Sequence, residues 1–107
     1  MAEANFVEVV LTCGSWQEAQ EVADTLLNKK LVACVEFIEV KSKSWWKSQL
    51  EEAKEVKLIM QSLSEHFDTI EEEVKKLHSY ETPALHAVPI TQISNESAQW
   101  LVGNTGG

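Results

Sequence analysis

The chain has 107 residues, the length of a single domain with one core, and no apolar run reaches the roughly 20 residues that a membrane span needs. Seventeen acidic residues against nine lysines, with no arginine, leave a net charge of −8. Because nucleic acids and anionic membranes are bound through basic surface, this balance argues against both as partners. A hydrophobic content of 44% is typical of a globular protein.

The N-terminal residues and the two cysteines bear on the cellular compartment. No basic patch followed by an apolar segment precedes Phe6, so we expect no secretory signal and a cytoplasmic location. Cys13 and Cys34 lack the spacing of a metal knuckle or a redox motif, and both lie in apolar stretches. We interpret them as buried free thiols, which indicates a reducing compartment, and a disulfide between them is the less favoured alternative.

The first half of the chain predicts a strand, a helix and a long hairpin. Residues Phe6–Cys13 are rich in β-branched side chains and predict a buried strand. Ser15 followed by Glu18 is a capping box, so we expect a helix to begin there. Residues 31–40 and 51–61 then predict two strands. Because the residues between them include neither glycine nor proline, we expect these strands to extend into one long hairpin.

The second half predicts a helix, a strand and a short final helix. Ser62 with Glu65 forms a second capping box, which predicts the start of the second helix. The apolar stripe of this helix consists of Leu63, Phe67, Ile70, Val74 and Leu77. Residues 85–90 predict the fourth strand, and residues 94–102 predict a short helix.

The order strand, helix, strand, strand, helix, strand predicts an α+β fold, a ferredoxin-like β-α-β-β-α-β sandwich with a short C-terminal helix, in one domain spanning residues 1–107. We expect its ends, 1–4 and 103–107, to be flexible. Both helices would pack on one face of the sheet. Apolar residues occur in both alternating sets of the second strand, as in 33–38, which indicates burial on both faces. Self-association is the simplest way to cover the second face.

A candidate site lies where the second helix ends. His78, Tyr80 and Glu81 fall within four residues, and Pro83 prevents the helix from resuming. His78 and Glu81 can ligate a divalent metal ion if the helical turn persists to Glu81, because residues three apart then share a face. The alternative is structural: His78 caps the end of the helix, and Tyr80 packs with its hydroxyl hydrogen-bonded.

The remaining candidates have simpler interpretations. We expect His66 to be solvated on the polar face of the second helix and His86 to be a structural residue of the fourth strand. Trp45 and Trp46 alternate across the hairpin, so one faces each side, and we interpret them as interface anchors rather than a ligand-stacking pair. No nucleophile elbow, glycine-rich phosphate loop or HExxH motif occurs, so we identify no catalytic residues and expect no enzymatic activity.

Several motifs resemble the CutA family of divalent-cation tolerance proteins in order and spacing: Ala33-Cys34-Val35, Trp45-Trp46-Lys47, Leu50-Glu51-Glu52, His78-x-Tyr80-Glu81-x-Pro83 and Val88-Pro89-Ile90. The resemblance extends over residues 9–101. It implies a ferredoxin-like protomer in a tight homotrimer, PII-like architecture, a role in copper tolerance and no established enzymatic activity. We expect Cys34, Trp45, Trp46 and Tyr80 to lie at a ligand cleft or an interface.

The chain departs from the family pattern at several positions. The family's His-Pro-Tyr reads His78-Ser79-Tyr80, and Ala84 replaces the glutamate that follows the later proline. Leu11 stands where some bacterial relatives place a copper-binding cysteine, and Ser48 replaces the glycine of the hairpin turn. Gln61 replaces the lysine that ends the third strand. We therefore expect weak binding of copper or another divalent cation, dependent on His78 alone among the imidazoles and not required for folding.

Two functions of different classes remain open. The first is a trimeric, metal-responsive protein that binds copper or another divalent cation near His78. The second is a PII-like signalling module that binds a small anionic ligand in an intersubunit cleft without metal. The lysines of the hairpin would line that cleft: Lys41, Lys43, Lys47, Lys54 and Lys57. An unidentified protein partner is compatible with either function.

Overall fold

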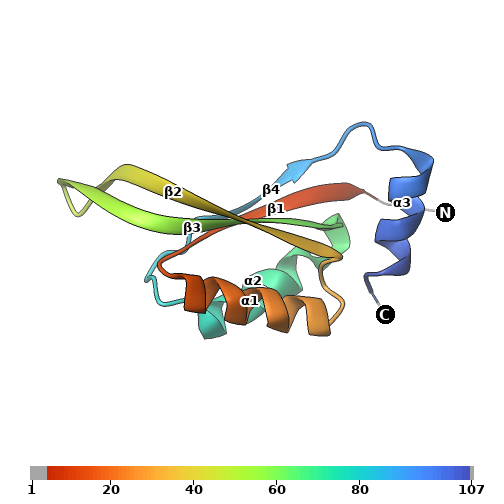
Figure 1. Cartoon of the computed structure of the whole chain (residues 1–107), viewed down its shortest axis with the longest axis horizontal. Helices are drawn as coiled ribbons and strands as arrows, with labels where there is room; N and C mark the ends of the chain where they lie inside the picture. The colour runs from red at the N-terminus through yellow and green to blue at the C-terminus, as the bar shows by residue number, and fades with distance from the viewer. Residues whose placement is uncertain (1–4, 107) are drawn as a thin grey trace.

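The computed structural model describes residues 5–106 and shows a four-stranded antiparallel sheet with two helices packed on one face (Figure 1). The strands are β1 (Phe6–Cys13), β2 (Cys34–Trp46), β3 (Gln49–Leu63) and β4 (Leu85–Pro89). The helices are α1 (Trp16–Asn28), α2 (Phe67–Leu77) and α3 (Asn95–Gly103), and the 3-10 turn η1 (Ser64–His66) precedes α2. The sheet order β2-β3-β1-β4 confirms the ferredoxin-like sandwich. Residues 1–4 and 107, part of the predicted flexible ends, lie outside the described residues.

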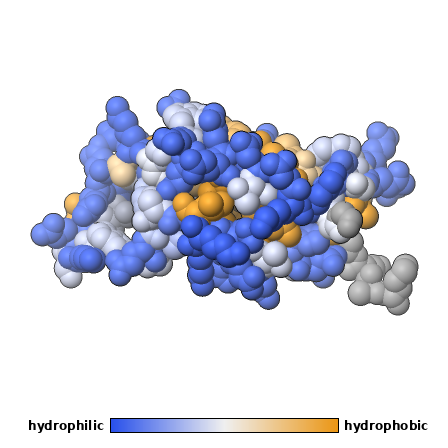
Figure 2. Space-filling model, turned by 90° about the horizontal axis from the view of Figure 1, so that it is seen from below, coloured by the Kyte–Doolittle hydropathy of each residue, from blue (hydrophilic) through white to orange (hydrophobic). Residues whose placement is uncertain are grey.

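The core lies between the sheet and helices α1 and α2. Side chains alternate between the two faces of a strand, so every second residue of β1 and β3 points at the helices. In register these residues form the buried pairs Val7–Ser62, Val9–Met60, Leu11–Leu58 and Cys13–Val56. The helices contribute the buried residues Ala19, Val22, Leu26, Ile70 and Val74. The outward surface of the helix layer is mostly hydrophilic, with apolar residues confined to small patches (Figure 2).

Strands β2 and β3 continue beyond the helices as a two-stranded arm, which we define as residues 40–55 (Figure 1). The turn at the tip of this arm consists of Lys47 and Ser48, both with left-handed backbone, at φ 50° and 66°. A two-residue turn of this kind matches the right-handed twist of the strands. The predicted long hairpin is thus confirmed. The arm makes the molecule elongated, with extents of 48 × 26 × 22 Å.

Strand β2 begins at Cys34, later than the predicted residue 31, because the intervening residues close helix α1. The N–H of Leu31 donates to the carbonyl of Leu26, and the N–H of Lys30 donates to the carbonyl of Leu27, both at 3.0 Å. Lys30 adopts the left-handed conformation, with φ 59°. These two bonds form a Schellman motif, which satisfies the last helical carbonyls before the chain can join the sheet.

The second predicted capping box is wrong. Ser62 belongs to β3, where it is fully buried, and its hydroxyl donates to the carbonyl of Leu31 at 2.6 Å. Leu63 pairs with Phe6 at the end of the sheet, so it is a strand residue and does not belong to the helical stripe. Helix α2 starts only at Phe67, after η1, and has no side-chain cap. Pairing with β1 keeps this segment extended, because it satisfies more backbone groups than a cap would.

The C-terminal segment contains the predicted short helix, and residues beyond it contact the rest of the molecule. Ser94 caps α3 by accepting the N–H of Ser97 at 3.1 Å. Thr105 is buried, and its hydroxyl donates to the carbonyl of Leu101 at 3.1 Å. The N–H of Gly106 donates to the carbonyl of Lys30 at 2.7 Å. Residues 103–106 are therefore attached to α3 and to the end of α1.

Candidate metal site

Helix α2 ends one residue before the predicted site. Leu77 is its last residue, and His78 has extended backbone, with φ −83° and ψ 137°. The helical turn that would have brought His78 and Glu81 onto one face does not form, so that expectation is wrong. Glu81 is exposed instead, with its carboxylate 3.9 Å from the ammonium group of Lys47 at the tip of the arm.

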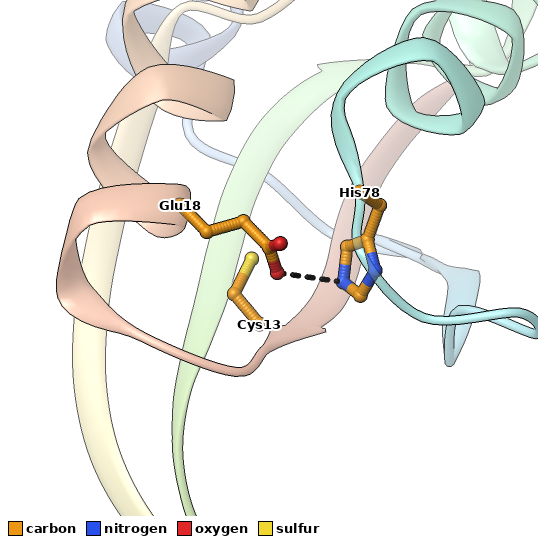
Figure 3. A group of neighbouring side chains, drawn as sticks. All are labelled: Cys13, Glu18 and His78. Carbon is orange, nitrogen blue, oxygen red and sulfur yellow. Dashed lines mark ion pairs between the residues drawn. The ribbon is translucent and has the colours of Figure 1, made fainter.

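His78 meets two other potential ligands, Cys13 and Glu18. Cys13 is the last residue of β1, Glu18 lies in the first turn of α1, and the imidazole enters from the end of α2 (Figure 3). One ligand atom of each residue lies within 4.8 Å of the others. The imidazole is fully buried, and the Glu18 side chain is 12% exposed. Residues far apart in the sequence thus form a compact thiol–carboxylate–imidazole group.

Local structure explains how Glu18 reaches this group. Gly14 ends β1, and Ser15 caps α1 by accepting the N–H of Glu18 at 3.1 Å, which confirms the first predicted cap. The Glu18 side chain turns back over the cap. One carboxylate oxygen accepts the N–H of Gly14 at 3.2 Å, and the other accepts the N–H of Ser79 at 2.9 Å. Glu18 therefore links the start of α1 to the turn after α2.

Hydrogen bonds at both ring nitrogens of His78 define its tautomer. Nε2 lies 2.6 Å from the carbonyl oxygen of Thr12, which can only accept, so Nε2 carries the hydrogen. The backbone N–H of Tyr80 donates to Nδ1 at 3.1 Å, so Nδ1 holds a lone pair. The ring is therefore neutral. Nε2 also lies 3.6 Å from a carboxylate oxygen of Glu18, the contact dashed in Figure 3.

The environment shifts the pKa values of the Cys13 thiol and the Glu18 carboxyl in opposite directions. Burial, with smaller contributions from the negative charges of Glu18 and Glu55, raises the pKa of the Cys13 thiol to about 12. Burial alone would also raise the pKa of Glu18. Hydrogen bonds from Ser79 and Gly14 outweigh that effect and lower the Glu18 pKa below its usual value. The group thus presents one fixed carboxylate charge, one neutral imidazole and one protonated thiol.

The donor set fits a soft or borderline divalent cation. Thiolate and imidazole are ligands that copper and zinc favour, and three protein ligands leave a coordination position open. Sequence reasoning identified His78 but missed Cys13 and Glu18 as its neighbours. Two signals were available: a cysteine directly before the strand-ending glycine, and an acid in the first turn of the following helix.

A cleft of about 560 Å³ lies beside this group, on the face of the sheet that the helices do not cover. Tyr80 lines it, and its hydroxyl donates to the carboxylate of Glu55 at 2.5 Å. Burial and this hydrogen bond raise the pKa of Tyr80. The charged residues of the lining are Glu51, Glu55 and Glu81. Among the described residues no lysine lines this cleft, and the predicted intersubunit cleft lined by the hairpin lysines stays a prediction.

The pairing register explains where the lysines lie. Ser42 pairs with Ala53, and Ser44 pairs with Glu51, and these two pairs face the cleft. Lys41 pairs with Lys54 one residue along, so both lysines point to the opposite face of the arm. The cleft is therefore acidic, whereas the reverse face of the arm carries both signs, with Lys41 2.7 Å from the carboxylate of Glu52.

The other predicted residues lie outside the thiol–carboxylate–imidazole group. Cys34 is a half-buried free thiol at the start of β2. Trp46 lines the cleft, whereas Trp45 is on the opposite face and 72% exposed, so the predicted alternation is confirmed. His66 is not solvated as predicted, because its Nε2 is buried without a hydrogen-bond partner in the described residues. His86 lies in β4 and is exposed.

Comparison with known proteins places the chain in a family. Residues 7–104 match the model of the family described as CutA1 divalent ion tolerance protein. The divalent-cation tolerance protein CutA of Archaeoglobus fulgidus is 40% identical over 93 residues, covering 87% of this chain and 91% of that protein. The CutA protein of Pyrococcus horikoshii is 31% identical over 97 residues, covering 91% and 95%.

Solved structures agree with the sequence comparison. The divalent cation tolerance protein of Thermus thermophilus superimposes with a TM-score of 0.91 at 31% identity, covering 94% of this chain and 99% of that one. The structure described as the periplasmic divalent cation tolerance protein CutA from Archaeoglobus fulgidus gives 0.89 at 38% identity, covering 95% and 98%.

Fold and site together define a ferredoxin-like chain with an extended arm and a buried thiol–carboxylate–imidazole group at the end of its second helix. Nearly the whole chain takes part in the match to known proteins. The chain belongs to the CutA1 divalent ion tolerance protein family.

Proposed function

We propose that this chain is a divalent-cation tolerance protein that binds copper, or another divalent cation of similar preference, at Cys13, Glu18 and His78. The observation that carries this proposal is the convergence of three different donor groups within 4.8 Å at a buried position. The names of the relatives, divalent-cation tolerance proteins, support the same assignment. When bound, the cation would supply only a stable charge partner for the thiolate and the carboxylate.

The chain's own residues oppose tight binding. Cys13 must give up its proton before its sulfur becomes a good ligand, and burial holds that proton firmly. His78 must give up the hydrogen bond from Tyr80 if Nδ1 binds, and also the bond to Thr12 if Nε2 binds. Only Glu18 is already charged, and each of its oxygens keeps a second lone pair. These costs support weak binding that releases a proton.

Titration calorimetry with copper and with zinc tests the site. We expect one binding site for each protomer, with copper bound more tightly than zinc because of its intrinsic ligand affinity. Cys13→Ala, Glu18→Gln and His78→Ala should each weaken binding by about tenfold or more. His66→Ala and His86→Ala are matched controls and should bind as the parent does. Binding that survives His78→Ala unchanged would remove the proposed site.

The proposal includes a cytoplasmic location and no catalytic role. The two cysteines, Cys13 and Cys34, are free thiols, which supports a reducing compartment. The sequence carries no motif for nucleophilic or phosphoryl chemistry. Among the described residues, no helix has the length and apolar character needed to cross a membrane. Fractionation of the expressing cells, with copper-challenged growth of a deletion strain, tests the location and the tolerance role together.

Assembly into a homotrimer is the second part of the proposal. The face of the sheet opposite α1 and α2 carries exposed apolar side chains, among them Ile38, Trp46 and Val88. A second copy would cover them, and the family resemblance implies the number three. Assembly would make the melting temperature rise with protein concentration. A folded monomer at micromolar concentration in light scattering would contradict the trimer.

The thiol of Cys34 gives an independent measure of this assembly. Cys34 pairs with Gln61 on the face that a second copy would cover, and it is only half-buried in the protomer. We therefore expect slow labelling by thiol reagents in the assembled protein and faster labelling when dilution favours the monomer. Fast stoichiometric labelling at every concentration would show that this face stays open.

A further inference from the structure

The candidate ligands also anchor the turn that follows α2. The N–H of Ser79 donates to Glu18 at 2.9 Å, and the N–H of Tyr80 donates to Nδ1 of His78 at 3.1 Å. Two successive backbone N–H groups are thus held by two of the three candidate ligands. A carboxylate has lone pairs to spare, whereas a neutral imidazole has only one. His78 therefore cannot bind a cation and keep its present hydrogen bonds.

This conflict arises whichever ring nitrogen binds. If Nδ1 binds, the lone pair that accepts the Tyr80 N–H is used directly. If Nε2 binds, its hydrogen must leave the carbonyl of Thr12 and move to Nδ1, where it meets the N–H of Tyr80 as a second donor. Rotation of the ring separates the same two partners. In every case the bond between Tyr80 and His78 is lost.

Tyr80 connects this bond to the arm. Its ring packs edge-on against His78, with centroids 4.8 Å apart, and its hydroxyl holds Glu55 of β3 at 2.5 Å. The ring also lies so close to Gly14 that a Cβ atom there would stand 3.2 Å from it, which is why a glycine suits this position. Residues 79–82 and Glu55 all line the cleft.

We propose that cation binding at His78 releases Tyr80 from Glu55, so that the 79–82 turn acts as a cation-released latch on the cleft. This inference rests on the cation site proposed above and adds a regulatory role to it. The coupling is reciprocal: whatever breaks the bond between Tyr80 and Glu55 makes the imidazole easier to recruit. Cation binding would then change the structure of the cleft and of the base of the arm.

Nuclear magnetic resonance with zinc, which is diamagnetic, tests the latch in the whole chain. We expect zinc to shift the ring nitrogen resonances of His78 and to speed hydrogen exchange of the Tyr80 amide by about tenfold, the effect of losing one hydrogen bond. The amide of Ala98, bonded to Ser94 in α3, is the internal control and should not change.

A pair of variants tests the reciprocal effect. Tyr80→Phe keeps the ring and the backbone N–H but removes the bond to Glu55, so zinc affinity should rise about threefold to tenfold. Thr82→Val, also in the lining of the cleft, should leave affinity unchanged. If zinc leaves the His78 ring nitrogens unshifted, the cation site and the proposed function fail. If zinc shifts them while Tyr80 exchange and the Tyr80→Phe affinity stay unchanged, the latch is overturned and the site stands.

Discussion

Strand β3 passes through two environments. Between Val56 and Leu63 its inward residues are buried against α1 and α2, whereas between Gln49 and Lys54 every residue is exposed. The hydrogen-bond ladder with β2 continues without interruption through both segments. The covered segment is therefore stabilised by burial of apolar side chains. The arm is stabilised by its cross-strand pairs and, in the proposed assembly, by contacts with a second copy. One segment of the strand is thus stabilised by the core, and the other leaves its side chains exposed for contacts with a second copy.

Substitution of two leucines in β3 should separate these environments most strongly. Leu58 is fully buried and Leu50 is 67% exposed. Leu58→Ala should lower the free energy of unfolding by about 2–5 kcal/mol, through lost burial and a cavity. Leu50→Ala should change it by less than about 0.5 kcal/mol in the monomer. Urea denaturation measures both, and equal losses would show that the arm has a core of its own.

The two tryptophans of the arm should separate its faces. Trp46 faces the cleft side, which a second copy would cover, and Trp45 faces the other side. Trp46→Ala should weaken assembly by about 2 kcal/mol or more, as expected for a buried aromatic anchor, and Trp45→Ala should weaken it less. Sedimentation over a concentration series gives the association constants. A larger effect of Trp45→Ala would assign the interface to the opposite face.

The turn of the arm should tolerate a glycine better than its present serine. Ser48 has φ 66°, a conformation that costs a residue with a side chain about 1 kcal/mol and glycine almost nothing. Ser48→Gly should therefore raise the free energy of unfolding by about 0.5–1 kcal/mol. Ser44→Gly, placed within β2, is the control and should destabilise the protein. If Ser48→Gly also destabilises, the left-handed turn is not the conformation in solution.

Acid should weaken the helix layer through Glu73. Hydrogen bonds from Lys29 at 2.8 Å and Lys76 at 3.2 Å lower the pKa of this buried carboxyl. A lowered pKa means that the pairs contribute stability above the unfolded pKa of about 4.3 and lose it as the pH falls through the folded value. Glu73→Gln should reduce the loss of stability over that interval. Thermal melts from pH 6 to pH 2, with Glu72→Gln as control, measure it; an identical acid response in both variants would contradict the assignment.

The fold followed from local patterns where one pattern had no competitor. The first capping box, the long hairpin and the final helix were confirmed. Each depended on a local signal, and no other structural role competed for the residues that carry it. The second capping box failed because Ser62 had another use, the buried bond to Leu31. That choice depends on the pairing of β3 with β1, and so on residues far away in the sequence.

The site was only partly predictable for the same reason. His78 stands out beside a helix-stopping segment, so the sequence indicates where an imidazole is placed. Its neighbours Cys13 and Glu18 lie about 60 residues earlier in the sequence. Because helix α2 ends at Leu77, Glu81 does not join His78 in the site. Local spacing therefore predicted an i, i+3 pair, whereas tertiary packing produced a group from β1, α1 and the end of α2.

Absorption of bound cobalt(II) tests the Cys13–Glu18–His78 site most directly. A thiolate ligand gives cobalt(II) a sulfur-to-metal charge-transfer band, and only two cysteines occur in the chain. We expect the band in the parent protein and in Cys34→Ala, and we expect it to disappear in Cys13→Ala and to weaken in His78→Ala. A band that persists in Cys13→Ala and disappears in Cys34→Ala would place the cation site elsewhere and contradict the proposed function of this group.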